Sequence, residues 1–504
     1  MKTMKSILAL VLVCCLALCL FTACSDKPGD AGQKPGSSTE EPIEVIAWFA
    51  DVYGHGGDHG ERLNEAVNRI TEPQGITVKL SLINIGDWLA KVQTSIIGGE
   101  RVDLMTYSIN CGVTSMITQK MAMDMTDYLK ADAPETMELM KDYLDADSVN
   151  GRIFGVPTLR SYVTNGYVCF QKDALDELGL TEKAQNLDSW SGLEEILGKL
   201  AEANKGTSRY AFCGGIGTVI ASTGYMIHGD KWSDIEVVDT LGDSANVIYA
   251  DKEGHVSLAQ KQESFIEACK IAKEWMDNGW IFPDSIYDSA MSAQETIGAG
   301  GALSEICTSE IGLEAMKQQI YKAPALCVKL YTGNIKTGTL TGWGMGLPVT
   351  CEEPEGAVKL INMLYTNSDL MKVLVNGEEG VDYELVDGQA KQIENQFSQG
   401  NFIYGNNLLT LPVYGTGADL YERVDKMNKE AECSPYLGFN LNTADLDLVL
   451  SQINAVTDQY RCAIASGGYS DAYFNEYMEK LEAAGVQDYI DAVQAQLSAW
   501  MESK

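Results

Sequence analysis

Three apolar segments near the start of the chain decide its fold: IEVIAWF (residues 43–49), ITVKL (76–80) and VDLMTY (102–107). Two segments of helical spacing, 61–70 and 87–97, lie between them. β-Branched and aromatic residues fill the apolar segments, and these residue types favour strands. Strand, helix, strand, helix, strand is the pattern of βαβ units. We therefore predict an α/β fold that begins with a parallel sheet.

Local signals mark the turns around these elements. Asp87 is predicted to be the N-cap of the second helix, and Gly98 and Gly99 are predicted to end it. The polar, glycine-rich segment 51–60 is predicted to be a loop after the first strand. Residues 251–254 (DKEG) are predicted to be a hairpin turn between two short extended segments.

The rest of the chain continues the alternation with longer helices. In the middle, helices are predicted over residues 189–203, 264–278 and 311–319. The last hundred residues are predicted to be mostly helical, over residues 418–431, 443–465 and 470–500.

The length of the chain and its net charge limit the number of domains and the kinds of partner that we expect. At 504 residues the chain is too long for one hydrophobic core, so two domains are expected. The net charge is −34, and removal of Lys2 and Lys5 with residues 1–23 would change it to −36. So acidic a surface is repelled by nucleic acid and by anionic lipid. We therefore predict no nucleic-acid partner and a soluble, monomeric body.

The first residues have the pattern of an export signal. Lys2 and Lys5 precede an apolar run, Ile7 to Phe21, and small residues lead to Cys24. This end resembles the lipobox of bacterial lipoproteins, which implies cleavage after Ala23 and lipidation of the Cys24 thiol. We therefore predict a signal peptide over residues 1–23 and a flexible tether over residues 24–42. The alternatives are a plain signal peptide or a membrane span, for which the apolar run is short.

Nine of the 13 cysteines lie beyond Cys24, and they are widely scattered. An odd number without C-x-x-C spacing does not fit a disulfide framework. Most of the nine lie in apolar segments, where a thiol acts as a small hydrophobic group. We predict free thiols, most of them buried.

Five motifs occur in order across nearly the whole chain. They are Gly86–Leu104, Gly155–Thr158 with Gly166–Asp173, Gly333-Asn334 with Gly342–Pro348 and the expected helix Pro354–Tyr365, Asn376–Tyr383, and Leu481–Gly485 with Gln496–Trp500. The ordered set is more specific than any one motif, and it resembles the extracellular solute-binding proteins of ABC importers, in particular the clostridial and bacillar lipoproteins presumed to bind oligosaccharides.

The resemblance implies a two-lobed periplasmic-binding-protein-like fold of the maltose-binding-protein class II type. Crossing strands would form the hinge, and a solute would bind in the cleft between the lobes. It implies an N-terminal lobe of residues 43–157 plus 330–415 and a C-terminal lobe of residues 158–329 plus 416–504. The function implied is capture of an oligosaccharide by cleft closure and delivery to ABC permease subunits, without covalent chemistry or a cofactor. The protein would be lipid-anchored at the outer face of the cytoplasmic membrane.

Candidate ligand residues follow from topology and side-chain chemistry. Sugars present hydroxyl edges and apolar faces, so a sugar cleft needs aromatic rings beside carboxylates, amides and arginine. The loops after the strands and the segments between lobes offer such groups, although core packing is the alternative for each aromatic ring. The predicted ligand residues are Trp48, Asp51, Tyr53, Tyr107, Asn110, Arg160, Tyr162, Trp232, Glu305 and Trp343. Ser108 lies beside them, whereas Trp88, Trp275 and Trp500 are expected to be core residues.

Other functions have weaker support. His55 and His59 form an H-x3-H pair that could bind zinc on a helix, but the glycines between them argue against a helix there, so we predict no metal. No G-x-S-x-G elbow or Walker A loop is present, and we predict that the protein is not an enzyme. An extracellular carbohydrate-active enzyme, and a ligand-presenting sensor or adhesion lipoprotein, stay open as alternatives.

Overall fold

The structure is a computed structural model, and it describes residues 42–108, 111–215, 225–226, 229–287 and 293–503. Cys24 and Asn110 lie outside the described residues. Within these ranges, none of the helices combines the length and apolar character that a bilayer crossing requires.

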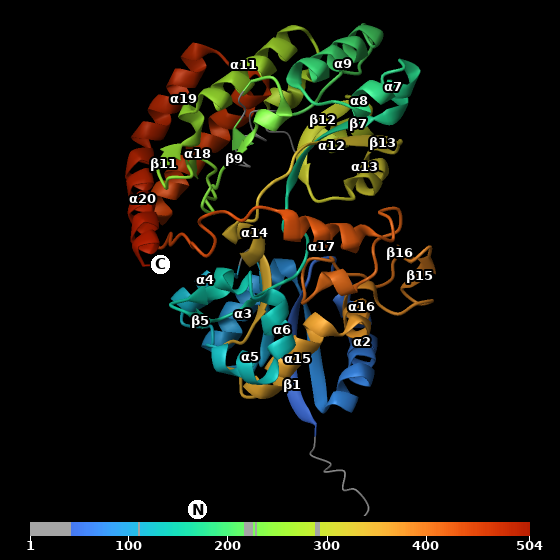
Figure 1. Cartoon of the computed structure of the whole chain (residues 1–504), viewed down its shortest axis with the longest axis vertical. Coiled ribbons are helices and arrows are strands. Elements are labelled where there is room, and N and C mark those ends of the chain that lie inside the picture. The colour runs from blue at the N-terminus through green and yellow to red at the C-terminus, as the bar shows by residue number, and fades with distance from the viewer. Residues whose placement is uncertain (1–41, 109–110, 216–224, 227–228, 288–292, 504) are drawn as a thin grey trace, which may run out of the picture. The chain divides into compact units, whose positions relative to one another are not determined.

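The first sheet confirms the predicted βαβ start. Strands β1 (Ile43–Asp51), β2 (Ile76–Asn84) and β3 (Leu104–Ser108) are parallel, and helices α2 (Gly56–Thr71) and α3 (Ile85–Ile97) connect them (Figure 1). Two later strands, β14 (Trp343–Gly346) and β6 (Val156–Pro157), complete the order β2-β1-β3-β14-β6. β14 is antiparallel to both β3 and β6, so the sheet is mixed.

Two local predictions in this sheet are wrong. Asn84, not Asp87, is the N-cap of α3, since its Oδ1 accepts a hydrogen bond from Gly86 N (2.9 Å) and Asp87 lies in the first turn. Segment 51–60 is not all loop, because α2 begins at Gly56. The Asp51 carboxylate accepts hydrogen bonds from Gly54 N and Gly56 N (both 2.8 Å), which satisfies donors at the start of that helix. The predicted end of α3 is confirmed, since the helix stops at Ile97 and Gly98 follows.

The second sheet is antiparallel, so the parallel pattern does not continue through the middle of the chain. β7 (Asn165–Gln171) is central, with β12 (Ser304–Ser309) on one side and β13 (Ala325–Tyr331) on the other. Every residue of β7 is buried. Its middle residues, Gly166–Phe170, form one apolar run, as in a parallel strand covered on both faces, so the pattern does not reveal the direction of the strand.

The long predicted helices are confirmed within a few residues, and the turn at 251–254 joins β10 (Ile248–Ala250) to antiparallel β11 (Val256–Leu258). Segment 470–500 forms two helices instead of one, because Gly485 has a left-handed φ of +88° between them. The matching helices are α9 (Trp190–Ala203), α11 (Glu263–Asp277), α13 (Leu313–Tyr321), α17 (Leu420–Glu430), α18 (Asp447–Ala463), α19 (Asp471–Ala483) and α20 (Val486–Glu502).

Shorter elements fill the connections. They are α4 (Val113–Thr118), α5 (Thr126–Asp132), α6 (Pro134–Met140), β4 (Ser148–Val149), β5 (Arg152–Ile153), α7 (Lys172–Glu177), α8 (Thr181–Gln185), β8 (Tyr225–Met226), β9 (Glu236–Val237), α12 (Ala293–Gly298), α14 (Thr337–Thr341), α15 (Pro354–Thr366), α16 (Ser368–Asn376), β15 (Tyr383–Val386) and β16 (Gln389–Gln392).

Buried apolar residues form separate cores. One core combines residues 45–163 with residues 335–404. A second lies within residues 168–331. A third core combines residues 241–269 with residues 436–497. These two segments are far apart in the sequence. The predicted lobe boundaries stay a prediction.

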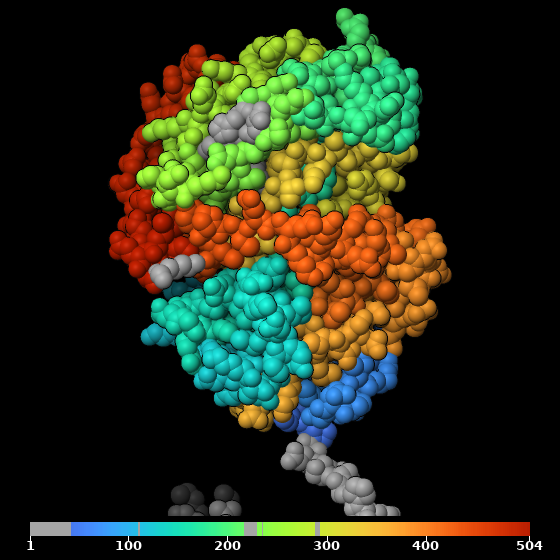
Figure 2. Space-filling view, viewed as in Figure 1, coloured from blue at the N-terminus to red at the C-terminus, as the bar shows by residue number. Residues whose placement is uncertain are grey.

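Residues 158–163, which leave the first core, contact α17, the orange helix labelled across the middle of Figure 1. Its colour range appears as an orange-red band across the middle of the surface in Figure 2. Asn428 of this helix donates from Nδ2 to Arg160 O (2.7 Å), and its Oδ1 accepts from Tyr162 N (3.0 Å). These bonds hold residues 158–163 in place between the first core and β7.

The nine described cysteines carry no disulfide in the structure. Four of them are buried, so the expectation that most of the nine are buried is wrong. Burial raises the pKa of the Cys111 thiol to about 11 and that of Cys269 to about 12. Cys169 and Cys307 lie across the strand pair from each other, with their Sγ atoms 3.9 Å apart. The thiols of Cys111 and Cys269, whose pKa values burial raises, react slowly, because the thiolate is the reactive form.

Candidate functional site

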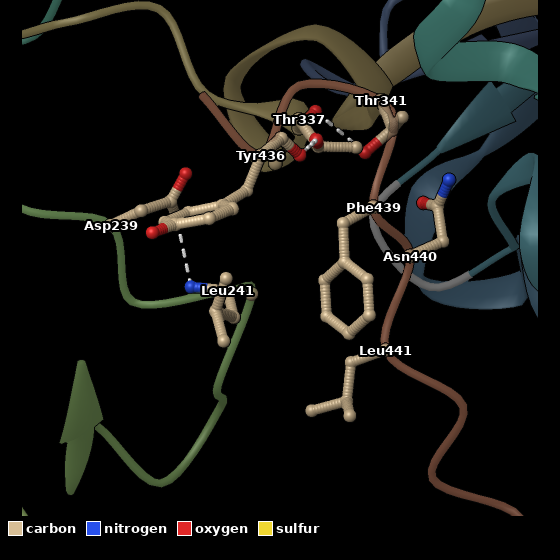
Figure 3. Close-up of a pocket in the computed structure, with 10 residues that line it drawn as sticks. Asp239, Leu241, Thr337, Thr341, Tyr436, Phe439, Asn440 and Leu441 are labelled. Atoms are coloured by element: carbon tan, nitrogen blue, oxygen red, sulfur yellow. Dashed lines mark hydrogen bonds between the residues drawn. The ribbon is translucent and has the colours of Figure 1, made fainter. Parts of the chain in front are cut away.

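Two adjoining cavities near α14 form what we call the inner groove. The first has a volume of about 200 Å³. Figure 3 shows Asp239 and Leu241 on one side of it and Phe439 and Leu441 on the other. Its lining residues are Asp239, Leu241, Gly242, Thr337, Gly338, Thr341, Tyr436, Phe439, Asn440 and Leu441.

The second cavity is larger, about 490 Å³, and it shares Thr341 and Leu441 with the first. Hydroxyl and amide side chains predominate in its lining. The lining residues are Ser108, Gly112, Val113, Thr114, Ser115, Thr118, Gln119, Thr341, Leu441, Asn442, Thr443, Ala444 and Asp447. Because the two cavities have two residues in common, one elongated ligand could contact both.

Hydrogen bonds from α14 and the residues before it place the wall that begins at Tyr436. Ser434 N donates to Ile335 O (2.8 Å), so the two segments run side by side. Thr337 Oγ1 then donates to Tyr436 O (3.2 Å) and accepts from Gly438 N (2.9 Å). One threonine side chain therefore links α14 to the segment that carries Phe439.

Few charged side chains line the groove. Among its described lining residues, Asp239 and Asp447 are the ionisable acids, and no lysine, arginine or histidine lines either cavity. Burial lowers the pKa of Lys336, although the charge of Asp239 opposes this. Ser108 Oγ is buried and lacks a hydrogen-bond partner within the described part of the chain. Such a lining suits a neutral ligand with many hydroxyl groups.

Three predicted ligand residues lie close to the groove without lining it. Tyr107 precedes the lining residue Ser108, and Trp343 pairs with Ser108 across the sheet. Arg160 Nη2 donates to Thr339 O of α14 (2.8 Å), and its Nη1 donates to Glu310 Oε1 (3.2 Å). Arg160 thus supports the helix that lines both cavities.

The predicted residues in and just after β1 do not line the inner groove. Trp48 is buried, and Lys91 Nζ lies 4.7 Å from its ring centroid. Asp51 is buried, with the Gln399 side chain and two backbone N–H groups as donors. Tyr53 is 52% exposed, which leaves its ring available at the surface.

Three further predicted residues lie in cores. Tyr162 packs edge-on against Tyr143, with ring centroids 4.8 Å apart, and Trp232 packs edge-on against Trp190 at 5.9 Å. Glu305 is buried in an ion pair with Lys317. Ligand contact by the ten predicted residues stays a prediction, and Asn110 is outside the described residues. The expected burial of Trp88 and Trp275 is confirmed.

Sequence reasoning missed the wall of the groove from Tyr436 to Leu441. These residues follow no strand and lie between two predicted helices, so topology gave no reason to place them in a cleft. The available signal was composition, since Tyr436, Phe439 and Leu441 occur in a loop that also contains Pro435 and Gly438. Apolar and aromatic residues in a turn-rich loop indicate burial against another element or a binding surface.

The two histidines of the H-x3-H pair have separate environments. His55 Nδ1 accepts from Ser398 N (3.2 Å), whereas the His59 ring packs edge-on against Phe397 at 6.4 Å. Among the described residues, no group of three or more His, Cys, Asp or Glu side chains is placed to hold a metal ion.

Asp147 is a buried carboxyl group in the core beside the groove. A Cβ atom built on Gly155 would lie 3.0 Å from its Oδ2, and one on Gly344 would lie 3.2 Å from it. Burial raises the pKa of Asp147 to about 7. Since the ordinary value is near 3.9, the folded protein binds more protons than the unfolded chain between about pH 4 and 7, and its stability falls as pH rises through that window.

We therefore expect Asp147→Asn to stabilise the protein at pH 8, because the variant has no buried charge to form. The expected gain in the free energy of unfolding is at least about 1.4 kcal/mol, the equivalent of one pKa unit. At pH 4 the variant and the wild type should match. Chemical denaturation at both pH values measures this, with Asp145→Asn, at an exposed position two residues earlier, as the control. Equal stability of Asp147→Asn and wild type at pH 8 would contradict the expectation.

Comparisons with known proteins place the chain in a family. Residues 65–375 match the model of a family described as bacterial extracellular solute-binding protein. Residues 435–502 match a domain of unknown function, DUF3502. A relative from Streptococcus pneumoniae, described as a carbohydrate ABC transporter substrate-binding protein, is 23% identical over 506 residues, with 96% of each chain covered.

Solved structures share the fold. The N-glycan transport solute binding protein NgtS of Streptococcus pneumoniae has a TM-score of 0.72 at 19% identity, covering 92% of this chain and 99% of that one. Its complex with Man5GlcNAc has a TM-score of 0.61 at 19% identity and the same coverage. An HMO-binding solute binding protein from Bifidobacterium longum infantis has a TM-score of 0.62 at 14% identity, again covering 92% and 99%.

These similarities confirm the predicted two-lobed α/β fold of solute-binding proteins. The family model covers more than half of the 504 residues. The protein therefore belongs to the bacterial extracellular solute-binding proteins.

Proposed function

We propose that the protein captures an oligosaccharide outside the cell in the inner groove and delivers it, chemically unchanged, to the permease of an ABC importer. The observation that carries this proposal is the groove, where hydroxyl, amide and apolar side chains line two cavities joined at Thr341 and Leu441. Sugar rings present hydroxyl edges and apolar faces, and both kinds of surface find partners there. The carbohydrate-transport description of the Streptococcus pneumoniae relative supports the same ligand class.

Ligand capture in this proposal depends on two lobes, residues 43–157 plus 330–415 and residues 158–329 plus 416–504. The first cavity takes Thr337 from one of these lobes and Asp239 from the other. A ligand that contacts both lobes favours the closed state only if it binds that state more tightly than the open one. Oligosaccharide contacts in the groove would supply this difference.

The location follows from the N-terminal segment. A lipid at Cys24, after cleavage behind Ala23, would hold the protein at the outer face of the cytoplasmic membrane, and residues 24–42 would act as the tether. Two acyl chains suffice for stable anchoring. Incorporation of labelled fatty acid at Cys24 measures this step, and an unlabelled mature chain would contradict it.

Thermal unfolding with a panel of saccharides tests the binding function. A bound oligosaccharide at 100 times its Kd is expected to stabilise the protein by about 2.7 kcal/mol. Peptides of similar mass should have no effect, and mass spectrometry should recover the saccharide intact. A shift with peptides alone would reject the ligand class, and a cleaved saccharide would favour a carbohydrate-active enzyme instead.

A further inference from the structure

Residues 435–502, the segment that matches a domain of unknown function, contribute to both cavities of the inner groove and include its wall from Tyr436 to Leu441. This segment supplies four of the ten residues that line the first cavity and five of the thirteen that line the second. It does not have a core of its own, since its apolar residues pack together with residues 241–269. The segment is therefore an integral part of the body that contains the groove.

Helix α20 fixes this wall from behind. Gln496 Nε2 donates to Asn442 O (3.0 Å), and Gln496 Oε1 accepts from Asn442 N (3.0 Å). One amide side chain thus satisfies both backbone groups of a residue that lines the second cavity. One turn later on the same helix face, Trp500 packs edge-on against Phe439, with ring centroids 5.8 Å apart at 76°.

The opposite side of the wall is fixed by α14, where Thr337 bonds to Tyr436 O and Gly438 N. Phe439 and Leu441 are thereby held between two elements and face Leu241 across the first cavity (Figure 3). A preorganised apolar surface costs little conformational entropy when a ligand binds.

We propose that residues 435–502 set the ligand specificity of the inner groove. Phe439 and Leu441 contact the apolar face of a sugar ring, Asn442 and Thr443 face its hydroxyl groups, and Gln496 is a positioning residue for this wall. The inference rests on the proposed function and deepens it, because it assigns sugar recognition to particular residues of the C-terminal segment.

The test uses the full chain and an oligosaccharide that stabilises the wild type, with Kd measured by titration calorimetry. Phe439→Ala is expected to weaken binding at least tenfold. Phe474→Ala is the matched control, since Phe474 is buried in the same core but lines neither cavity. It should lower the melting temperature and leave Kd within twofold of the wild type.

Gln496→Ala separates positioning from stability, because Gln496 is only half-buried. It is expected to raise Kd at least threefold with a nearly unchanged melting temperature, and it keeps the proposal testable if Phe439→Ala fails to fold. If Phe439→Ala and Gln496→Ala both bind the saccharide as tightly as the wild type does, the assignment of specificity to residues 435–502 is wrong and the proposed function stands. A wild type that binds no saccharide overturns the proposed function and this wall with it.

Discussion

Glu305→Ala is expected to lower the free energy of unfolding by about 3–5 kcal/mol, the cost of leaving a buried charge without its partner. Lys317 Nζ donates to Glu305 Oε1 (2.7 Å), and the exposed fractions of these side chains are 3% and 5%. Tyr321 OH donates to the same oxygen (2.7 Å). Burial lowers the pKa of Lys317, but the charge and hydrogen bond of Glu305, together with the nearby Cys307 and Cys169, hold the pKa above its usual value. The ammonium therefore stays charged at neutral pH, and in the variant it would keep its hydrogen bond to Gln294 Oε1 (3.0 Å) but lose its carboxylate partner.

Urea denaturation monitored by tryptophan fluorescence measures the loss. The double variant Glu305→Leu with Lys317→Met should recover most of the stability, because it removes both charges and keeps apolar volume. Glu195→Ala is the matched control, since Glu195 forms its ion pairs at the surface, and its midpoint should stay close to that of the wild type. An unchanged midpoint for Glu305→Ala would show that the pair contributes nothing, and Glu305 would then be free for the ligand role predicted from sequence.

Tyr107→Ala is also expected to cost about 3–5 kcal/mol, the usual range when a large buried aromatic side chain is truncated. The Tyr107 side chain is 1% exposed, and its burial raises the pKa of the hydroxyl. The ring fills the space above two glycines, since a Cβ atom on Gly346 would lie 2.2 Å from it and one on Gly155 would lie 3.2 Å from it. Because glycine has no side chain, neither Gly155 nor Gly346 can fill the cavity that the variant leaves.

Tyr107→Phe separates packing from ligand contact. The hydroxyl lies 3.5 Å from Leu347 O, a distance at which a hydrogen bond is weak, so this variant should keep nearly the stability of the wild type. It should also keep the wild-type Kd for the saccharide. A tenfold loss of affinity with unchanged stability would instead show that the hydroxyl contacts the ligand, as the sequence prediction holds.

The periodic elements were predictable because their signals are local. The strands at 43–51, 76–84 and 104–108 and the helices between them differ from expectation by a few residues at their ends. The wrong predictions concern features that the local sequence does not decide. Each feature depends on a partner that is distant in sequence, or on a choice between neighbouring polar groups. Asn84 and Asp87 can both cap a helix, and only the conformation of the chain decides between them.

The direction of β7 and the role of Glu305 show the same limit. The middle of β7, Gly166–Phe170, is one apolar run, and this pattern does not distinguish a parallel from an antiparallel neighbour. Glu305 has the chemistry of a sugar ligand, but Lys317, twelve residues later, lies next to it once α13 packs on the sheet. A side chain has the same chemistry in a core and in a cleft, so its type alone does not place it.

By itself, the sequence determined the α/β class and, through the order of its motifs, the solute-binding family. Those properties depend on residue spacing and composition, which the chain carries whether or not it is folded. Only the tertiary structure decided which side chains form the groove. Thr337 and Gln496 lie 159 positions apart, yet their hydrogen bonds hold the two ends of one short wall around Phe439. Contacts between segments so distant in sequence exist only after the cores have packed, and no local pattern records them.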